Sequence, residues 1–134
     1  MTGYSATPLA AKLGIKPGMA MRAVHAPKGY RDLLAPLPDG ARITAGGRGR
    51  ADFVHHFAKR KAELAQALAA YRKALEPAIP LWISWPKKSA GVATDITEDA
   101  IRALALPLGY VDVKVCAVSE VWSGLKLVVR RERR

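Results

Sequence analysis

Hydrophobic side chains return at two different spacings along the chain, and each spacing predicts one kind of secondary structure. Within residues 59–75 they return every three or four positions, at Leu64, Leu68, Tyr71 and Leu75. Because an α-helix turns once every 3.6 residues, this spacing gathers the four side chains on one face. We therefore expect a long helix from Lys59 to Leu75 that buries this face.

Short apolar segments between turn-forming residues predict the strands. Leu81 to Trp85 is nearly continuous in apolar character, as expected of a strand that helices cover on both faces. Asp52 to Phe57 is a second clear strand. Weaker patterns predict four more, at Met19 to Val24, Ala41 to Thr44, Tyr110 to Val118 and Lys126 to Arg130. The last two form a hairpin whose connection is the six residues from Ser119 to Gly124.

Capping residues and prolines delimit three shorter helices. One extends from about Pro8 to Leu13, since proline at the first helical position sacrifices no hydrogen bond. A second is expected from Tyr30 to Leu34. A third, from about Thr97 to Leu106, has two alternative N-caps: Thr97 itself, or Asp95, which stands three residues before Glu98 as in a capping-box variant.

The order of these elements predicts an α/β fold. Strands that alternate with helices favour a three-layer, Rossmann-like unit with a mostly parallel sheet, right-handed crossovers and a C-terminal antiparallel hairpin. A chain of 134 residues is long enough for one core, so we expect a single domain over residues 1–134. A flexible loop of glycine and arginine is expected at 45–50, and a basic tail at 131–134.

Composition favours a soluble protein of a reducing compartment. Half of the residues are hydrophobic, a quarter are charged, and no apolar run approaches the roughly 18 residues of a membrane span. The first ten residues lack the basic start and apolar run of a signal peptide. Cys116 is the one cysteine, so no intrachain disulfide can form. We expect a cytoplasmic protein without membrane contact.

The net charge points to anionic partners. Lysine and arginine number 22 against 11 acidic residues, a formal charge of +11 that attracts polyanions. The positive charges are spread along the chain, which is typical of a solvated surface, and non-specific contact with nucleic acid through the basic segments is an alternative. Pairing of an exposed sheet edge in a homodimer is another way for a domain of this size to find a partner.

Four segments resemble one known family. They are IKPG at Ile15 to Gly18, SWPKKSAGVATDITED at Ser84 to Asp99, VDVKVCAV at Val111 to Val118 and WSGLKLVVR at Trp122 to Arg130. Together they resemble small bacterial proteins catalogued as domain of unknown function 3052. The resemblance covers nearly the whole chain and implies an element order similar to the later half of class I methyltransferase-like Rossmann folds. It implies no activity, because one fold hosts many functions.

Binding of a nucleotide-like cofactor usually requires two features that this chain lacks. The turn after the first strand should be rich in glycine, but His25 to Tyr30 contains one glycine. A carboxylate should end the second strand, but none occurs between Thr44 and Asp52. We therefore expect a binding or interaction module rather than an enzyme, with no cofactor. The main alternative is a reduced methyltransferase-like protein that binds a nucleotide-like small ligand.

A candidate anion pocket lies at the carboxyl edge of the predicted sheet, where open parallel sheets bind ligands. Two lysines precede the helix that begins near Thr97, whose free amides favour an anion. The full candidate set is Lys87, Lys88, Ser89, Thr94, Asp95, Trp122, Ser123 and His25. The alternative is that the lysines are solvated and Asp95 only caps the helix. We assign no catalytic residue.

The histidines are candidate metal ligands by residue type. His55 and His56 are adjacent on a predicted strand, so their imidazoles point to opposite faces and cannot share one ion without distortion. His25 and Cys116 would complete a set of four, but no close-spaced metal motif joins them. We therefore expect no metal site.

Overall fold

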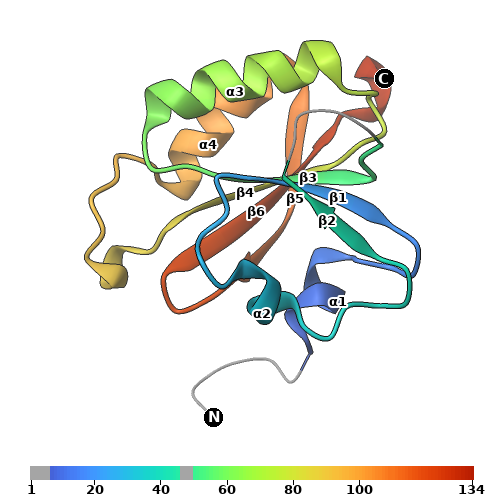
Figure 1. Cartoon of the computed structure of the whole chain (residues 1–134). Helices are drawn as coiled ribbons and strands as arrows, with labels where there is room; N and C mark the ends of the chain where they lie inside the picture. The colour runs from blue at the N-terminus through green and yellow to red at the C-terminus, as the bar shows by residue number, and fades with distance from the viewer. Residues whose placement is uncertain (1–6, 46–49) are drawn as a thin grey trace.

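The computed structural model describes residues 7–45 and 50–134, and this part of the chain forms a mixed sheet of six strands in the order β2-β1-β3-β4-β6-β5 (Figure 1). The strands are β1 Ala20–Val24, β2 Arg42–Thr44, β3 Phe53–Phe57, β4 Leu81–Pro86, β5 Tyr110–Ala117 and β6 Trp122–Val129. The helices are α1 Leu9–Leu13, α2 Tyr30–Leu34, α3 Lys61–Ala74 and α4 Glu98–Ala105, with short 3-10 turns η1 Lys88–Ala90, η2 Leu106–Leu108 and η3 Arg131–Arg133. Most of the loop expected at 45–50 lies outside the described residues.

Strand directions agree with the expected α/β class. β1 pairs in parallel with β2 and β3, and β3 pairs in parallel with β4. β6 runs antiparallel between β4 and β5, so the C-terminal hairpin completes the sheet. The chain moves from β1 outward to β2 and then returns across β1 to β3, which makes the β1 region the point where the order of strands reverses.

Helices cover both faces of the sheet. Figure 1 shows α3 and α4 on one face and α1 and α2 on the other. Under α3 and α4, the fully buried Leu64 and Leu68 of the predicted helical stripe pack in a core that includes Ile101. Under α1 and α2, a second core contains Leu13 and Trp82. Among the described residues, no helix is both long and apolar enough to cross a bilayer.

The C-terminal hairpin differs from its sequence-based prediction. β6 begins at Trp122, so this tryptophan lies in a strand and not in the connection expected from Ser119 to Gly124. The register pairs Ser123 with Trp85 and Gly124 with Ser84. A Cβ atom at Gly124 would lie 3.3 Å from the Trp82 ring and 3.0 Å from Val118. Gly124 therefore permits close packing inside the sheet, and the glycine that suggested a turn has another reason to be there.

The structure decides between the two N-caps that the sequence allows for α4. The α4 N-cap is Thr97, whose hydroxyl accepts a hydrogen bond from the Ala100 amide at 3.1 Å. Asp95 instead accepts from the Lys61 amide at 2.7 Å, at the start of α3. A side chain 34 residues downstream thus satisfies one of the free amides of α3.

Candidate functional site: the carboxyl edge of the sheet

Three neighbouring hollows open at the edge where the parallel strands end, which we call the carboxyl edge. The β1–β2 hollow has a volume of about 540 Å³ and lies between the loop after β1, the start of α2 and the end of β2. The hairpin hollow, about 490 Å³, lies between that loop and Ser119–Trp122. The histidine hollow, about 420 Å³, lies between His25, Trp122 and the start of α3. Pro27 lines all three, so the β1–α2 loop is their common wall.

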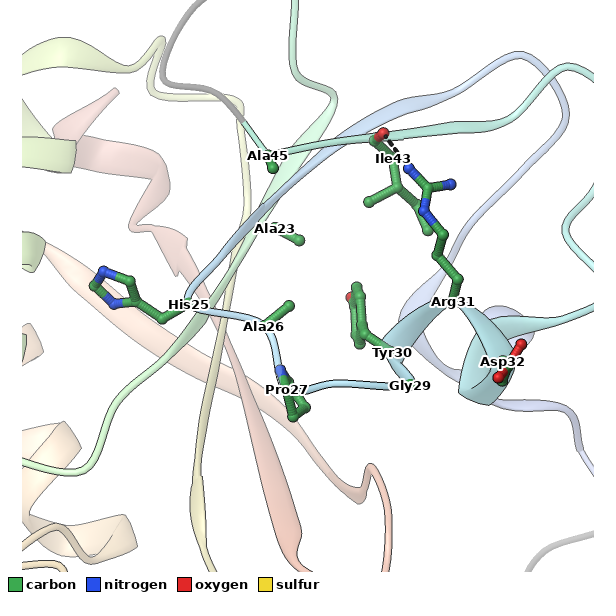
Figure 2. A pocket seen from close by; sticks show the side chains of 10 residues that line it. All are labelled: Ala23, His25, Ala26, Pro27, Gly29, Tyr30, Arg31, Asp32, Ile43 and Ala45. Carbon is green, nitrogen blue, oxygen red and sulfur yellow. Dashed lines mark hydrogen bonds between the residues drawn. The ribbon is translucent and has the colours of Figure 1, made fainter.

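The β1–α2 loop owes its shape to two residues with positive φ. Gly29, with φ of 84°, precedes α2 and adopts the left-handed conformation that glycine allows without strain. His25 adopts a φ of 58° directly after β1, and it is the one non-glycine residue with positive φ in residues 7–45 and 50–134. In Figure 2 the His25 ring extends from one side of the loop, while Tyr30 lies on the other side, toward Ala23 and Ile43.

A buried polar chain supports the β1–β2 hollow. The Tyr30 hydroxyl lies 2.5 Å from His55 Nδ1, and His55 Nε2 lies 2.7 Å from the Ser84 hydroxyl. All three side chains are buried. Burial, with a smaller contribution from neighbouring His56, lowers the pKa of His55 to about 3, and burial raises the pKa of Tyr30. These three hydrogen-bonded side chains are therefore neutral, and their hydrogen bonds fix the tyrosine ring that lines the hollow.

A second polar group lies on the other face of β3. His56 Nε2 lies 2.7 Å from Glu63 Oε1, and His56 Nδ1 lies 2.6 Å from the Tyr71 hydroxyl. His25 Nδ1 lies 3.6 Å from the same Glu63 oxygen. Burial lowers the pKa of His56, and the Glu63 carboxylate opposes that shift. The sequence-based prediction that His55 and His56 face opposite sides is thus confirmed.

The structure brings only part of the predicted anion set together. His25 and Trp122 both line the histidine hollow, where the Trp122 ring packs edge-on against Phe57 with centroids 5.1 Å apart. Trp122 is 9% exposed, so it is part of a wall and not a projecting lid. Ser123 pairs within the sheet.

The remaining members of the set line none of the three hollows formed by the described residues. They are Lys87, Lys88, Ser89, Thr94 and Asp95. The Lys87 amide donates to the Val121 carbonyl at 2.8 Å, which ties this segment to the hairpin. The Thr94 hydroxyl donates to the Lys59 carbonyl at 2.7 Å. The segment therefore connects the hairpin to the start of α3, and an anion site along it stays a prediction.

Sequence reasoning missed Glu63, Tyr71 and Tyr30, which hold the histidines. Glu63 reads as an ordinary charge in the first turn of a helix, and Tyr71 reads as one member of the apolar stripe. The sequence does contain a signal for these partners. Adjacent histidines on a strand face opposite sides, so a helix that packs on the sheet after that strand covers one of the two imidazoles. Polar residues next to the buried stripe of that helix were therefore candidate partners.

A group of basic side chains surrounds the carboxyl edge. Lys28 lines the hairpin hollow, and Lys59 and Arg60 line the histidine hollow. Lys61 follows at the start of α3, where Asp95 is bonded, and Lys87 and Lys88 lie next to the hairpin. We call these six residues the basic rim.

Comparisons with known proteins find the fold but no family. No protein-family model and no curated protein sequence matches the chain. A SAM-dependent methyltransferase from Aquifex aeolicus is similar at 11% identity, with 91% of this chain and 88% of that chain covered and a TM-score of 0.61. The magnesium protoporphyrin IX methyltransferase ChlM from Synechocystis, solved with bound SAM, is similar at 13% identity, with 91% and 74% covered and a TM-score of 0.55.

A third solved structure is a transfer RNA enzyme. The m1A22 tRNA methyltransferase TrmK from Bacillus subtilis is similar at 12% identity, with 95% of this chain and 67% of that chain covered and a TM-score of 0.55. At such identities the likeness shows the fold alone, an α/β Rossmann-like fold of the kind found in SAM-dependent methyltransferases.

Proposed function

We propose that this protein binds a nucleotide-like small ligand in the β1–β2 hollow, with S-adenosylmethionine and its demethylated product as the first candidates. The observation that carries the proposal is the position of the hollow. It opens at the carboxyl ends of β1 and β2, beside the point where the strand order reverses between β1 and β3. In open α/β sheets, ligands bind in the crevice at this point.

The lining of the β1–β2 hollow suits a flat ring system with polar substituents. Ala23, Ile43 and Ala45 provide apolar surface, and Tyr30 provides an aromatic wall (Figure 2). The Arg31 side chain donates to the Ile43 carbonyl at 3.2 Å, and this hydrogen bond holds a positive charge beside the β1–β2 hollow. A few polar groups in an apolar cleft are typical of small-molecule sites.

We propose binding and not methyl transfer, because the usual recognition features are absent from the sequence. The β1–α2 loop has the single glycine Gly29, and β2 ends at Thr44, followed by Ala45, where a ribose-binding carboxylate is usual. Asp52 is no substitute, since it bonds the amide of Ala20 at the opposite end of β1. The resemblance to domain of unknown function 3052 stays a prediction and adds no activity.

Thermal denaturation with S-adenosylmethionine, its demethylated product and ATP tests this proposal. A ligand that binds the folded state alone raises the melting temperature in proportion to the logarithm of its concentration at saturation. Ala45 is an exposed residue of the lining, so Ala45→Trp places a large side chain in the hollow and should abolish the shift in melting temperature. Ala103→Trp, an exposed position on α4, is the matched control and should retain it. No shift with any ligand at millimolar concentration, or equal loss in both variants, would overturn the proposal.

A second candidate function is non-specific binding of nucleic acid by the basic rim. The observation in its favour is that Lys28, Lys59 and Arg60 line hollows at the same edge, while other lysines of the rim lie beside them. Such a rim attracts phosphates without reading bases.

A further inference from the structure

Three side chains with metal-binding atoms meet beside the histidine hollow, and two of them, His25 and Glu63, line it. His25 comes from the loop after β1, His56 from β3 and Glu63 from the first turn of α3. One ligand atom of each lies within 4.8 Å of the other two. Glu63 Oε1 is 2.7 Å from His56 Nε2 and 3.6 Å from His25 Nδ1. We call these three residues the histidine cluster.

We propose that the histidine cluster binds a divalent transition-metal ion, with Zn²⁺ as the first candidate. Two imidazoles and one carboxylate form a donor set that suits zinc and leaves a coordination position open. Ligand atoms about 2.0–2.1 Å from a tetrahedral ion lie about 3.3 Å from one another. Two of the three separations, 2.7 and 3.6 Å, bracket that spacing, and the third, between the two histidines, is no more than 4.8 Å. The His25 side chain is 66% exposed, so it has room to adjust.

Tyr71 contacts the ring nitrogen of His56 that does not face Glu63, as expected if His56 binds a metal. Its hydroxyl lies 2.6 Å from His56 Nδ1, while Nε2 faces Glu63. Histidines that bind metals usually have their second ring nitrogen held by a hydrogen bond, which fixes the orientation of the ring. His56 is 2% exposed and lies on a central strand, so the most rigid ligand is also the one that is held.

The backbone of His25 gives an independent reason to expect a role for its side chain. At a φ of 58°, glycine would be free of strain, and a histidine there carries a conformational cost. His25 lies one residue beyond the end of β1, and its ring centroid stands 5.4 Å from that of His56. A site that uses the imidazole explains why the loop holds a histidine where glycine is easier to accommodate.

The surroundings indicate what would complete the coordination shell. Lys59 and Arg60 line the same hollow and are exposed, so water and salt screen their repulsion of a cation. Their positive charge would attract an anion to the open position. We therefore infer that the fourth ligand is an anionic group, a carboxylate or a phosphate, on the molecule that enters the histidine hollow.

The test uses tag-free, chelator-treated full-length protein titrated with Zn²⁺ by calorimetry and with Co²⁺ by visible absorption. We expect one ion per chain and the d–d bands of four-coordinate cobalt. Glu63→Gln should weaken binding at least tenfold, whereas Glu76→Gln, an exposed acid after α3, should leave it unchanged. His25→Gly should also weaken binding at least tenfold while raising the melting temperature without metal, because it relieves the backbone strain.

Two results would overturn the metal proposal. One is the absence of saturable binding of either ion. The other is binding that Glu63→Gln and His25→Gly leave intact, which would assign the ion to other groups such as Cys116. Inorganic phosphate added to the cobalt-loaded protein should change the absorption bands, and an unchanged spectrum would refute an anionic fourth ligand. Ala45→Trp should retain metal binding, so failure of the nucleotide proposal is distinguishable from failure of this one.

Discussion

Asp52 fixes the register of β1 and β3 at the amino end of the sheet. Its carboxylate accepts from the Ala20 amide at 2.8 Å, and its own amide donates to the Ala20 carbonyl at 2.6 Å. The Ala20 amide, followed by Arg50, lowers the pKa of this carboxyl below its usual value. A carboxyl with a depressed pKa stabilises the folded state above its unfolded pKa, near 3.9, and this stabilisation is lost as pH falls through the folded pKa.

Asp52→Asn should therefore destabilise the protein by about 1 kcal/mol at pH 7. Its deficit relative to the unmodified protein should begin to shrink below about pH 4, where the unfolded state takes up a proton, and should vanish below the lowered folded pKa, where position 52 is neutral in both proteins. Urea unfolding from pH 7 to pH 2 measures this difference. A deficit that is constant with pH would mean that the charge of Asp52 contributes nothing.

Tyr71 and Tyr30 provide a matched pair of tests, because each hydroxyl bonds Nδ1 of a histidine on a different face of β3. If His56 is a metal ligand, Tyr71→Phe should weaken Zn²⁺ binding by roughly tenfold or more, since a positioning partner is lost. Tyr30→Phe should leave metal affinity unchanged. Both variants leave a buried imidazole nitrogen unpaired, so both should lower stability by about 1–3 kcal/mol. Equal metal affinities in the two variants would remove the positioning role of Tyr71.

At the scale of elements, the start of α3 depends on a loop that lies far away in sequence. Asp95 accepts from the Lys61 amide, while Thr97 caps α4. Each replacement by alanine should cost about 1 kcal/mol. Asp95→Ala should speed hydrogen exchange in the first turn of α3, and Thr97→Ala should do so in the first turn of α4. Faster exchange in α4 for Asp95→Ala would restore the other cap assignment.

Local sequence patterns predict the elements of this fold, but they do not decide which helix Asp95 caps. The range of α2 from Tyr30 to Leu34 and the succession of strands and helices along the chain follow from periodicity and turn residues, which are local signals. The offset between Asp95 and Glu98 is also local, but it fits two different helices equally well. Only packing of α3 beside α4 decides between them. The same limit applies to Glu63, whose partner histidines lie on other elements.

At the scale of the whole molecule, the carboxyl edge was predictable and its contents were only partly so. Parallel strands end at one edge and the antiparallel β6 begins there, which places His25, after β1, and Trp122, at the start of β6, on the same edge. Which side of each loop faces a hollow depends on β6 starting at Trp122 and on the left-handed turn at His25. The two proposed sites therefore both lie at this edge, the apolar hollow toward β2 and the histidine cluster toward α3, and His25 belongs to the lining of the first and to the second.

The basic rim extends this edge beyond the two sites, and its charge can be tested independently of them. We expect the protein to bind a labelled DNA duplex at low salt, with log K falling by about 0.9 per log unit of salt for each phosphate contacted. Replacing Lys59, Arg60 and Lys61 by glutamine should reduce that slope by about two to three such contacts.

The matched control replaces Lys16, Lys73 and Lys126 by glutamine. It removes the same number of positive charges, three, at positions outside the basic rim. Fluorescence anisotropy between about 50 and 200 mM salt resolves slopes that differ by this amount. A smaller slope in the first variant alone assigns the contact to the carboxyl edge, because total charge is equal in both. Equal slopes would mean that charge acts from the whole surface, and no binding at the lowest salt would exclude the polyanion function. Metal affinity should be unchanged in both variants, because neither set of replaced residues contains a proposed metal ligand. This measurement distinguishes the function of the basic rim from that of the histidine cluster.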